Sequence, residues 1–504
     1  MDFVTACVRL FLHHRVRAIA RYATRAEEIQ RHTLAYLVRQ ASRTQWGMEH
    51  GYGSIRSYED FAAQVPTGNY ATLKPYIMKM MDGERDILWK GLITRFATSS
   101  GTTSDAVKFI PVSKRHLRHG HMKGGHDVTA TYLDANRSSR ISRGHSLILS
   151  GSFAPQYSRG RVKAGDISAC MAEAIPPFLR KLMHIEPPLE ISQIQDIHEK
   201  YNAIADVIVS KNLVSFSGLP NWNIMLLELA MKKAGARTAE ELWPNMEFFA
   251  HGGTSLVPYR HRLSELFPSG RLHFIENYNA TEGFFGVQTD LSDPAMTLML
   301  DYDAFYEFIP MDVYGTPEAK AVPVWKVETG VDYAVIVSTS SGLWRYDIGD
   351  VVRFTRKAPY RFVIVGRTHQ SINVWGEDLS VQQAEKALER ACRRCGAVVK
   401  EFTVAPVCLE DTTGWHQWLV EFGREPATQE EFATILDDMV KEEDHDYMHF
   451  RAHGGVKPLT VVAARSGLFY DWLDAKGKMG GQHKIPRLCN TRKYMDELLE
   501  MNQK

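Results

Sequence analysis

"NLVSFSGLPNWNIMLLELAMKKAG" (residues 212–235) combines two patterns in one run. Its first part is a short apolar stretch that passes into a turn of small residues, which is typical of a buried strand. In its second part apolar residues recur at helical spacing until Gly235, a residue that often ends a helix. A buried strand that continues through a small-residue turn into a helix is the repeating unit of α/β proteins.

The same strand-then-turn pattern recurs along the chain, with Gly, Ser or Thr at the strand ends. We therefore predict an α/β fold. The further segments with this pattern are SLILSGSFA (146–154), EFFAHGG (247–253), LHFIENYNATEG (272–283), DYAVIVST (332–339) and RFVIVGR (361–367).

The predicted secondary structure differs between the two ends of the chain. The first ninety or so residues are helix-rich, and "SYEDFAAQ" (57–64) begins with a serine cap and an acidic first turn. After Arg367 the pattern predicts a helix over 382–394, two paired strands, a second helix over 428–443 and a further strand. We predict a large N-terminal domain over 1–366 and a small, mobile α+β domain over 367–504.

Composition narrows the class of protein. The chain has 504 residues, with 60 Lys and Arg against 59 Asp and Glu, so its net charge of +1 argues against nucleic acid as a partner. Cys392 and Cys395 form a single C-x-x-C at what looks like a helix end. We interpret the cysteines as reduced, structural thiols of a cytoplasmic protein rather than as a metal or redox site.

The N-terminal stretch "MDFVTACVRLFLHHRVRAIARYA" mixes apolar residues with arginines at helical spacing. Arg9 and the His13–Arg15 run interrupt it, so it is too polar to span a bilayer. A transit peptide and a membrane-surface helix remain open as alternatives. We favour a first helix packed on the core, and predict no membrane partner.

Several familiar signatures are absent from the sequence. It contains no G-x-x-x-x-G-K-[ST], no G-x-G-x-x-G, no H-E-x-x-H and no G-x-S-x-G. These absences remove the commonest phosphate, dinucleotide, metalloprotease and hydrolase interpretations.

Five polar segments are candidates for the chemistry of the protein. In "FATSSGTTSDAVKFI" (96–110), hydroxyls, backbone N–H groups and a following lysine suit either a phosphate loop or an ordinary turn. In "ENYNATEG" (276–283), Glu282 suits Mg²⁺ and Tyr278 suits a base, whereas the alternative is a plain corner capped by Thr281. Asp350 suits the hydroxyls of a ribose or belongs to a hairpin.

Two cations complete this set of candidates. Arg367 follows the apolar "YRFVIV" and suits ribose or phosphate, unless the segment is only a linker. Lys484, in "GQHKIPR", is an ordinary surface charge unless the C-terminal segment turns inward.

The order of these segments resembles that of the adenylate-forming superfamily. The closer resemblance is to the auxin-responsive family of acyl-acid amido synthetases and its bacterial branch, and it extends from about residue 55 to 500. The segments that carry it are SYEDFAAQVP, YATLKPYI, SSGTTSDAVKFIPVS, LWPNMEFFAHGG, ENYNATEGFFGVQ, YEFIPM, SGLWRYDIGDVVRF and GGQHKIPRL.

The resemblance implies an enzyme that uses ATP and Mg²⁺ in two half-reactions. A small carboxylic acid is first adenylated, with release of pyrophosphate, and an amino acid amine then displaces AMP to form an amide. The resemblance also implies roles for individual residues. Glu282 and Lys484 would be catalytic, Glu282 would hold the metal, and the nucleotide would contact Ser99, Ser100, Gly101, Thr102, Thr103, Lys108, Tyr278, Asn279, Thr281, Asp350 and Arg367.

The acyl site and the domain hinge have candidate residues as well. The acyl group is expected near residues 120–130 and 215–225, with Phe216, Trp222, His251 and Gly252 as substrate-binding candidates, but we favour ordinary core packing as the reason for the aromatic ones. The superfamily often has glycine in the loop where this chain has Ser104. At the hinge many relatives have Asp or Lys after the Gly-Arg pair, where this chain has Thr368 and His369. The alternative functions are an acyl-CoA ligase of the same superfamily and a non-catalytic nucleotide-binding protein.

Overall fold

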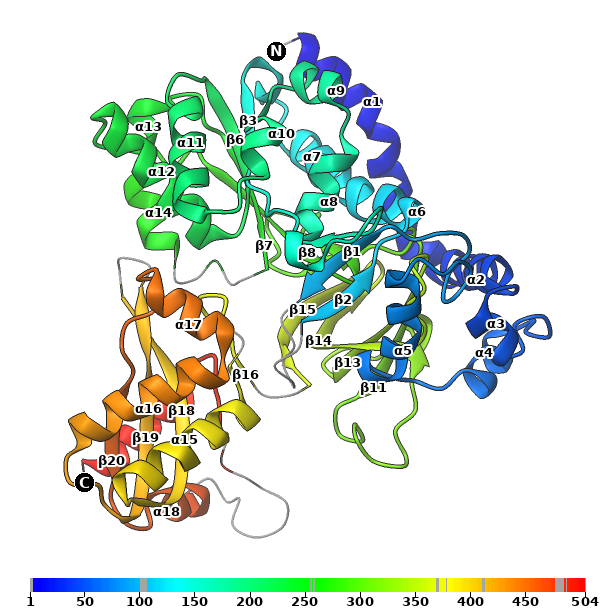
Figure 1. The fold of residues 1–504 in the computed structure, drawn as a ribbon. Helices are drawn as coiled ribbons and strands as arrows, with labels where there is room; N and C mark the ends of the chain where they lie inside the picture. The colour runs from blue at the N-terminus through cyan, green and yellow to red at the C-terminus, as the bar shows by residue number, and fades with distance from the viewer. Residues whose placement is uncertain are drawn as a thin grey trace. The chain divides into compact units, whose positions relative to one another are not determined.

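The computed structural model of the protein has a mixed α/β architecture with a large N-terminal unit and a smaller C-terminal unit (Figure 1). The large unit is built from Met1–Ser99, Val107–Gly253 and Ser264–Thr368, and the small unit mainly from His369–Lys504. The predicted fold class is confirmed. The structure describes residues 3–99, 107–253, 256, 259–368, 371–377, 379–409, 413–475, 485 and 487–503.

Helices form the N-terminal part of the large unit, shown in blue in Figure 1. Ser57 caps α4 in a capping box with Asp60, as its sequence predicts. The side chain of Gln30 is buried in α2 and donates hydrogen bonds to the carbonyl oxygens of Leu300 and Ala304, at 2.8 and 2.9 Å. These bonds tie the helices to the sheet. The helices are α1 (Phe3–Ala20), α2 (Tyr22–Ala41), α3 (Gln45–Glu49), α4 (Tyr58–Gln64) and α5 (Tyr70–Met81).

A sheet of 12 strands forms the body of the large unit, in the order β12-β11-β13-β14-β15-β10-β9-β8-β7-β6-β3-β5. Strands β5, β3, β6, β7 and β8 are parallel to their neighbours, whereas from β8 onward every pair is antiparallel. Strand β8 therefore joins the two halves of the sheet. The strands are β3 (His145–Ile148), β5 (Ile185–Glu186), β6 (Leu213–Gly218), β7 (Phe248–Gly252), β8 (His273–Ala280), β9 (Gly283–Val287), β10 (Met296–Leu298), β11 (Ala304–Pro310), β12 (Val322–Pro323), β13 (Asp332–Thr339), β14 (Tyr346–Lys357) and β15 (Tyr360–Arg367).

Helices connect the strands of the parallel half. Helix α12 (Pro220–Ala234) follows β6 and ends at Gly235, whose φ of +70° is a left-handed conformation that suits glycine. A small sheet, β2-β1-β4, contains β1 (Arg95–Ser99), β2 (Lys108–Pro111) and β4 (Lys163–Gly165). The remaining helices of the connections are α6 (Lys114–His116), the π-helix η1 (Leu117–Met122), α7 (Lys123–Ala135), η2 (Ile141–Arg143), η3 (Pro155–Tyr157), α8 (Ile167–Ala174), α9 (Pro177–Leu182), α10 (Leu189–Ser192), α11 (Ile197–Ile208), α13 (Ala239–Leu242), α14 (Arg260–Leu266) and η5 (Val324–Lys326).

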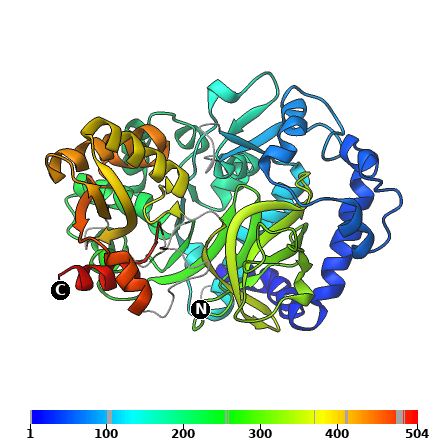
Figure 2. The same ribbon diagram turned by 90° about the horizontal axis from the view of Figure 1, so that it is seen from below.

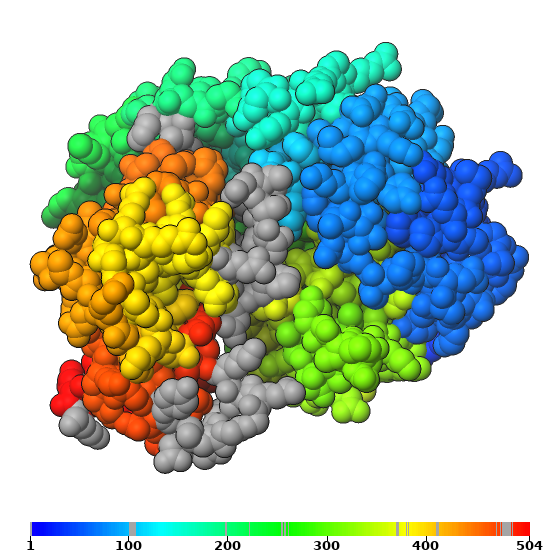
Figure 3. All heavy atoms as spheres, turned by 60° about the horizontal axis from the view of Figure 1, so that its bottom comes forward, coloured from blue at the N-terminus to red at the C-terminus, as the bar shows by residue number. Residues whose placement is uncertain are grey.

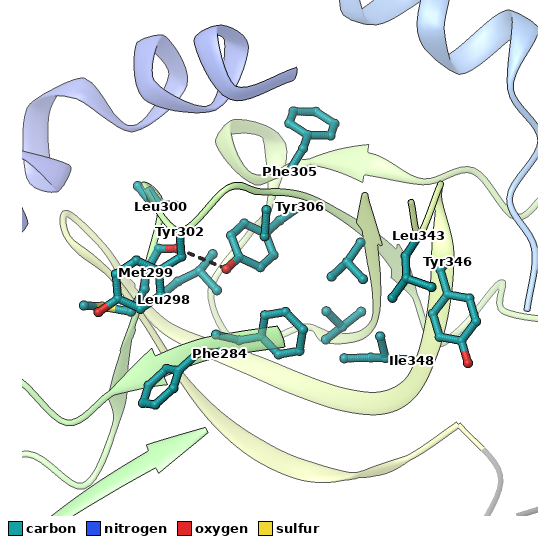
Figure 4. Close-up of a cluster of buried hydrophobic side chains, with 14 of the residues drawn as sticks. Phe284, Leu298, Met299, Leu300, Tyr302, Phe305, Tyr306, Leu343, Tyr346 and Ile348 are labelled. Carbon is teal, nitrogen blue, oxygen red and sulfur yellow. Dashed lines mark hydrogen bonds between the residues drawn. The ribbon is translucent and has the colours of Figure 1, made fainter. Parts of the chain in front are cut away.

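The core of the large unit lies between the antiparallel strands and the N-terminal helices. Figure 4 shows part of it, where the Tyr306 hydroxyl donates a hydrogen bond of 3.0 Å to the carbonyl oxygen of Met299. Long strands β14 and β15 curve strongly around this core, as the yellow-green ribbons in Figure 2 show. In the space-filling view the blue N-terminal helices lie directly against the light-green residues of this half (Figure 3). The curvature brings strands that are distant in the sheet order toward one another.

The small unit is an α+β structure in which the predicted helix and paired strands are present. Strands β18 and β19 pair antiparallel, and β20 pairs parallel with β19. Helix α15 ends at Cys395, so Cys392 and Cys395 lie at a helix end as predicted. Its elements are β16 (Ser371–Ile372), β17 (Leu379–Ser380), α15 (Val381–Cys395), β18 (Val398–Cys408), β19 (Gly414–Arg424), α16 (Gln429–Glu443), α17 (His445–Ala452), β20 (Thr460–Ala464), α18 (Leu468–Ala475) and α19 (Lys493–Asn502).

Among the helices of the described residues, none combines the length and the apolar character needed to cross a bilayer.

Candidate active site

Tyr278 lies near the carboxyl end of β8, the strand that joins the parallel and antiparallel halves of the sheet. Only 8% of its surface is exposed, and its ring meets Phe285 and Phe362 edge-on. Its hydroxyl donates a short hydrogen bond to the carboxylate of Asp350. Burial and the nearby Asp350 charge raise the pKa of Tyr278 well above its ordinary value, so this phenol is a permanent donor.

Asp350 lies inside strand β14, at an irregularity of the pairing with β13. Ala334 pairs with Val351 but Ile336 pairs with Asp347, so four steps along β14 match two along β13. The sequence alternative placed Asp350 in a hairpin with Asp347 and Gly349 as turn residues. Asp350 does lie in the β13–β14 hairpin, but the chain reverses before Tyr346, so Asp347 and Gly349 belong to strand β14. A bulge of this kind redirects side chains, and bulges are common beside active sites.

Arg367, at the end of β15, pairs with Asp350 in the β-ladder and also through its side chain. Its Nη1 lies 3.3 Å from Asp350 Oδ1. Gly349, which precedes Asp350, has a φ of +85°, a conformation in which other residues are strained. Strands β8 and β14 are separated by three strands in the sheet order, and yet Tyr278, Asp350 and Arg367 meet.

Glu282 lies in the short turn between β8 and β9 and is buried, with 8% of its surface exposed. The Thr281 hydroxyl donates a hydrogen bond of 2.6 Å to its Oε2. Burial raises the pKa of the Glu282 carboxyl. Among the described residues, no three His, Cys, Asp or Glu side chains gather closely enough to form a metal cluster by themselves. A lone carboxylate of this kind suits Mg²⁺, which usually takes one or two protein carboxylates and completes its shell with phosphate and water.

The residues that sequence reasoning assigned to a phosphate loop are only partly described. Ser99 ends β1 and Lys108 begins β2, and the two residues face one another in an antiparallel pair. Ser100, Gly101, Thr102 and Thr103 lie outside the described residues, as does Lys484. The run 96–110 thus includes most of two paired strands, β1 and β2. Its contact with phosphate stays a prediction.

Two buried histidines next to the β8–β9 turn escaped the sequence analysis. His116 Nε2 donates a hydrogen bond of 3.0 Å to the backbone oxygen of Glu282, and His121 Nδ1 donates one of 2.8 Å to Asn279 Oδ1. Burial lowers the pKa of His116 to about 4 and that of His121 to about 3, so both imidazoles are neutral. They fix the turn that carries Glu282. His121 lies in a π-helix, a rare element that occurs often at functional sites. No pattern in the sequence predicted this π-helix.

The candidates for the acyl site occupy two kinds of environment. Phe216 is 1% exposed and stacks on Phe249, with ring centroids 4.2 Å apart, so it is packed in the core. Trp222 is half-buried in the first turn of α12, edge-on to Tyr201. Contact of Phe216 or Trp222 with a substrate stays a prediction.

His251 and Gly252 end strand β7 beside β8. His251 is buried, and its backbone oxygen accepts a hydrogen bond of 2.8 Å from Asn277 Nδ2. A Cβ on Gly252 would lie 2.3 Å from the backbone oxygen of Asn277, so the close approach of β7 and β8 requires glycine there. Packing of the two strands therefore explains the glycine at position 252, and contact of His251 or Gly252 with a substrate stays a prediction.

The sequence matches the models of one protein family along most of its length. GH3 family models match the N-terminal domain over residues 15–212, the central domain over 297–367 and the C-terminal domain over 382–493. The chain belongs to the GH3 family. The central-domain match contains Asp350 and Arg367, two of the three side chains that meet at the site.

Relatives of this GH3 protein match along nearly their whole length. It is 23% identical to the indole-3-acetic acid-amido synthetase GH3.8 of Oryza sativa subsp. indica, over 96% of this chain and 92% of the relative. It is 25% identical to the jasmonoyl-L-amino acid synthetase GH3.5 of Oryza sativa subsp. japonica, over 92% of both chains. The solved structure of the acyl acid amido synthetase AtGH3.15 in complex with 2,4-DB covers 97% of this chain and is itself covered to 95%. Its TM-score of 0.62 at 18% identity shows a shared fold.

Proposed function

We propose that this GH3 protein is an acyl-acid amido synthetase, a ligase that uses ATP to join a small carboxylic acid to the amine of an amino acid. Family membership supports this proposal, since the relatives above are amido synthetases. The observation that carries it is the meeting of Tyr278, Asp350 and Arg367 where the two halves of the sheet join. Ligands of open α/β sheets bind at the carboxyl ends of strands where the topology changes.

The proposed reaction has two steps. A carboxylate oxygen of the acid attacks the α-phosphorus of ATP, and the bond to the bridging oxygen breaks, which releases pyrophosphate and leaves an acyl-adenylate. The amine nitrogen then attacks the acyl carbon, AMP leaves with the electrons of the C–O bond, and the nitrogen loses a proton to give the amide.

Asp350 is the proposed acceptor for the ribose hydroxyls. Its two oxygens offer about four lone-pair sites, and the Tyr278 hydroxyl and Arg367 take one each. A carboxylate can accept several hydrogen bonds at once, which suits the two hydroxyl groups of a ribose. Tyr278 and Arg367 hold the carboxylate in one orientation, so that little rotational freedom is lost when the nucleotide binds.

Glu282 is the proposed protein ligand of Mg²⁺. Its turn is held by Thr281 on one side and by His116 on the other, so the carboxylate is oriented before a cation arrives. Bound magnesium neutralises phosphate charge during attack at the α-phosphorus. Asn279 and Thr281 stay predicted nucleotide contacts.

The remaining assignments rest on the family resemblance. Ser99, Ser100, Gly101, Thr102, Thr103 and Lys108 are proposed to hold the phosphates, and Lys484 to bring positive charge to the α-phosphate. We also propose a cytoplasmic location, supported by the six cysteines, all of which are free thiols.

Pyrophosphate exchange with a panel of carboxylic acids tests the first step. With Mg²⁺ and ATP present, we expect at least one aryl or cyclic acid to support exchange of labelled pyrophosphate into ATP. Each amino acid is then added in turn, and mass spectrometry identifies the product. Omission of the acid and omission of Mg²⁺ are the controls.

Two results would overturn the proposal. Absence of exchange with every acid would remove the adenylation step. A thioester formed with coenzyme A, with no amide from any amino acid, would identify an acyl-CoA ligase instead.

A further inference from the structure

Helix α1 has two faces of different character. Thr5, Leu12 and Ile19 are buried and are spaced by seven residues, so they share the face that packs on α7. Residues at the complementary positions are exposed. The first helix thus packs on the core, as the sequence favoured, but it uses only half of its surface.

Two arginines anchor this helix to its neighbours. Arg9 Nε donates a hydrogen bond of 2.8 Å to the carbonyl oxygen of Leu133 in α7. Arg15 forms ion pairs of 2.8 and 2.9 Å with Asp127 and Asp301. The orientation of α1 is therefore fixed, and its outer face is held outward by contacts within the large unit.

The outer face of α1 is apolar in its first half. Phe3, Leu10 and Phe11 are 81%, 77% and 75% exposed, and Val4 is 54% exposed. These positions fall at helical spacings of one, seven and eight residues, so their side chains form a single stripe, with Cys7 in its middle. A contiguous stripe of large apolar side chains in water is unfavourable unless something covers it.

Cations continue the same stripe toward the end of the helix. Arg17 and Arg21 are exposed and lie on the face that carries Phe3 and Leu10, and the exposed His14 lies on the same face between them and the apolar residues. Within Phe3–Ala20 there is no acidic residue. Exposed apolar side chains that can enter the acyl boundary, together with nearby cations that anionic lipids attract, are the features by which a helix binds a membrane surface.

The size of the stripe distinguishes this partner from a second copy of the chain. Two phenylalanines with a leucine and a valine offer roughly 500 Å² of surface, if each aromatic side chain contributes about 150–200 Å². A stable dimer needs about 800 Å² from each partner. If the stripes of two copies met, the arginines would face apolar or like-charged side chains, whereas lipid phosphates and carboxylates complement them.

We propose that α1 is a docking helix for the surface of an anionic lipid bilayer. Phe3, Leu10 and Phe11 insert at the level of the head groups and upper acyl chains, while Arg17 and Arg21 meet lipid phosphates. The helix lies on the membrane and stays packed on α7. This inference departs from the sequence prediction of no membrane partner, because the sequence alone did not reveal which side chains of the helix the core leaves outside.

Vesicle co-sedimentation of the full chain tests the proposal. Vesicles of phosphatidylcholine alone are compared with vesicles that also contain phosphatidylserine. We expect binding to the anionic vesicles that weakens with added salt, and a loss of roughly tenfold or more in the double variant Leu10→Gln, Phe11→Gln. Glutamine is a good helix former, so α1 is retained.

A matched pair of apolar residues on another helix provides the control. Phe178 and Leu182, on α9, are 69% and 71% exposed. The double variant Phe178→Gln, Leu182→Gln should bind vesicles as the parent protein does, and both double variants should keep the parent's thermal unfolding midpoint.

Three outcomes would overturn the proposal. These are no binding to anionic vesicles, equal binding to neutral ones, and an equal loss in both double variants. A dimer that forms without lipid, and whose disulfide cross-link disappears in Cys7→Ser, would assign the stripe to a second copy instead.

Discussion

Two carboxylates three positions apart in β14 have different surroundings. Asp347 accepts hydrogen bonds from the Gly349 backbone, at 2.8 Å, and from the Tyr314 hydroxyl, at 2.5 Å, so its oxygens serve the local structure. Asp350 instead meets Tyr278 and Arg367, whose side chains come from other strands. The chemistry of the two residues is identical, and their different roles follow from the bulge that lies between them.

Asp350→Asn should weaken ATP binding while the fold is kept. The amide retains an acceptor oxygen for Tyr278 but loses the charge that faces Arg367 and the ribose. Hydrogen bonds to charged groups contribute about 1.5–3 kcal/mol, so we expect the Kd for ATP to rise about tenfold or more. Isothermal titration calorimetry measures this, with Asp332→Asn, a half-exposed carboxylate of β13 paired with Arg353, as the control. An unchanged Kd in Asp350→Asn would contradict the ribose assignment.

The Mg²⁺ concentration that the enzyme requires should depend on pH through Glu282. Because burial raises the pKa of its carboxyl, the proton returns at a higher pH than on an ordinary glutamate. A protonated carboxyl is a poor cation ligand. We expect the Mg²⁺ concentration for half-maximal pyrophosphate exchange to rise as pH falls toward this raised pKa. In Glu282→Gln the dependence on pH should disappear and the Mg²⁺ requirement should be high throughout; an unaltered profile would exclude Glu282 as the ligand.

Bulged strands determine where the site forms. In the β8–β9 hairpin Tyr278 pairs with Gly286 and Asn279 with Phe284, so β9 has an extra residue opposite the candidate side chains. The pairing of β13 with β14 is irregular beside Asp350. The two irregularities turn Tyr278 and Asp350 toward each other across the curved sheet.

Arg345 links the β13–β14 hairpin to the N-terminal helices. Its guanidinium is 7% exposed, forms a bidentate ion pair with Glu307 at 2.8 and 2.9 Å, and donates to the carbonyl oxygen of Val65 at 2.6 Å. Its φ of +42° is unusual for a residue other than glycine. These contacts hold β14 in place immediately before Asp350.

Arg345→Met should destabilise the large unit strongly. Removal of one partner leaves Glu307 buried without its counter-charge, which costs about 3–5 kcal/mol. Arg353→Met is the matched control, since Arg353 pairs with Asp332 at a half-exposed position where an ion pair contributes at most about 1 kcal/mol. Urea unfolding of both variants measures the difference. Similar losses in the two variants would contradict the buried role of Arg345.

Sequence patterns predicted the elements well but not their irregularities. The apolar runs of β6, β7, β8, β13 and β15 are visible because burial dictates residue type at each position. Register shifts depend on which strands become neighbours, and no local pattern encodes that. For this reason Tyr278, Asp350 and Glu282 could be proposed from their residue types and order, whereas their contacts with one another and with His116 and His121 could not.

The two units of the protein have separate acid-sensitive ion pairs. In the large unit burial raises the pKa of Asp301, but hydrogen bonds and charge from Arg15, with the charge of Lys123, outweigh it and hold the pKa at about 2. In the small unit burial raises the pKa of Asp437, but hydrogen bonds from Arg451, Lys441 and Tyr447 outweigh it and hold the pKa at about 2. Each unit therefore depends on a carboxylate that remains ionised at low pH.

Both carboxylates should contribute stability that is lost in acid. An unfolded aspartate has a pKa of about 3.9, so the contribution is complete above that value and is lost as pH falls through about 2. Asp301→Asn should lower the stability of the large unit and flatten its dependence on pH, and Asp437→Asn should do the same for the small unit. Differential scanning calorimetry between pH 5 and pH 2 measures both. An acid dependence that is equally steep in the variants would contradict this account.

The change of strand direction at β8 has a consequence for folding kinetics. On its antiparallel side β8 pairs with β9 across a turn of two residues, and β13, β14 and β15 also pair with neighbours in the chain. On its parallel side every pairing requires a long crossover, and contacts that are distant in sequence form slowly. We expect amide protons of β9, β14 and β15 to gain protection early in pulse-labelling refolding experiments, before those of β3 and β5. Asp350 and Arg367, which we propose to face the nucleotide, would then be in place before the parallel strands have paired.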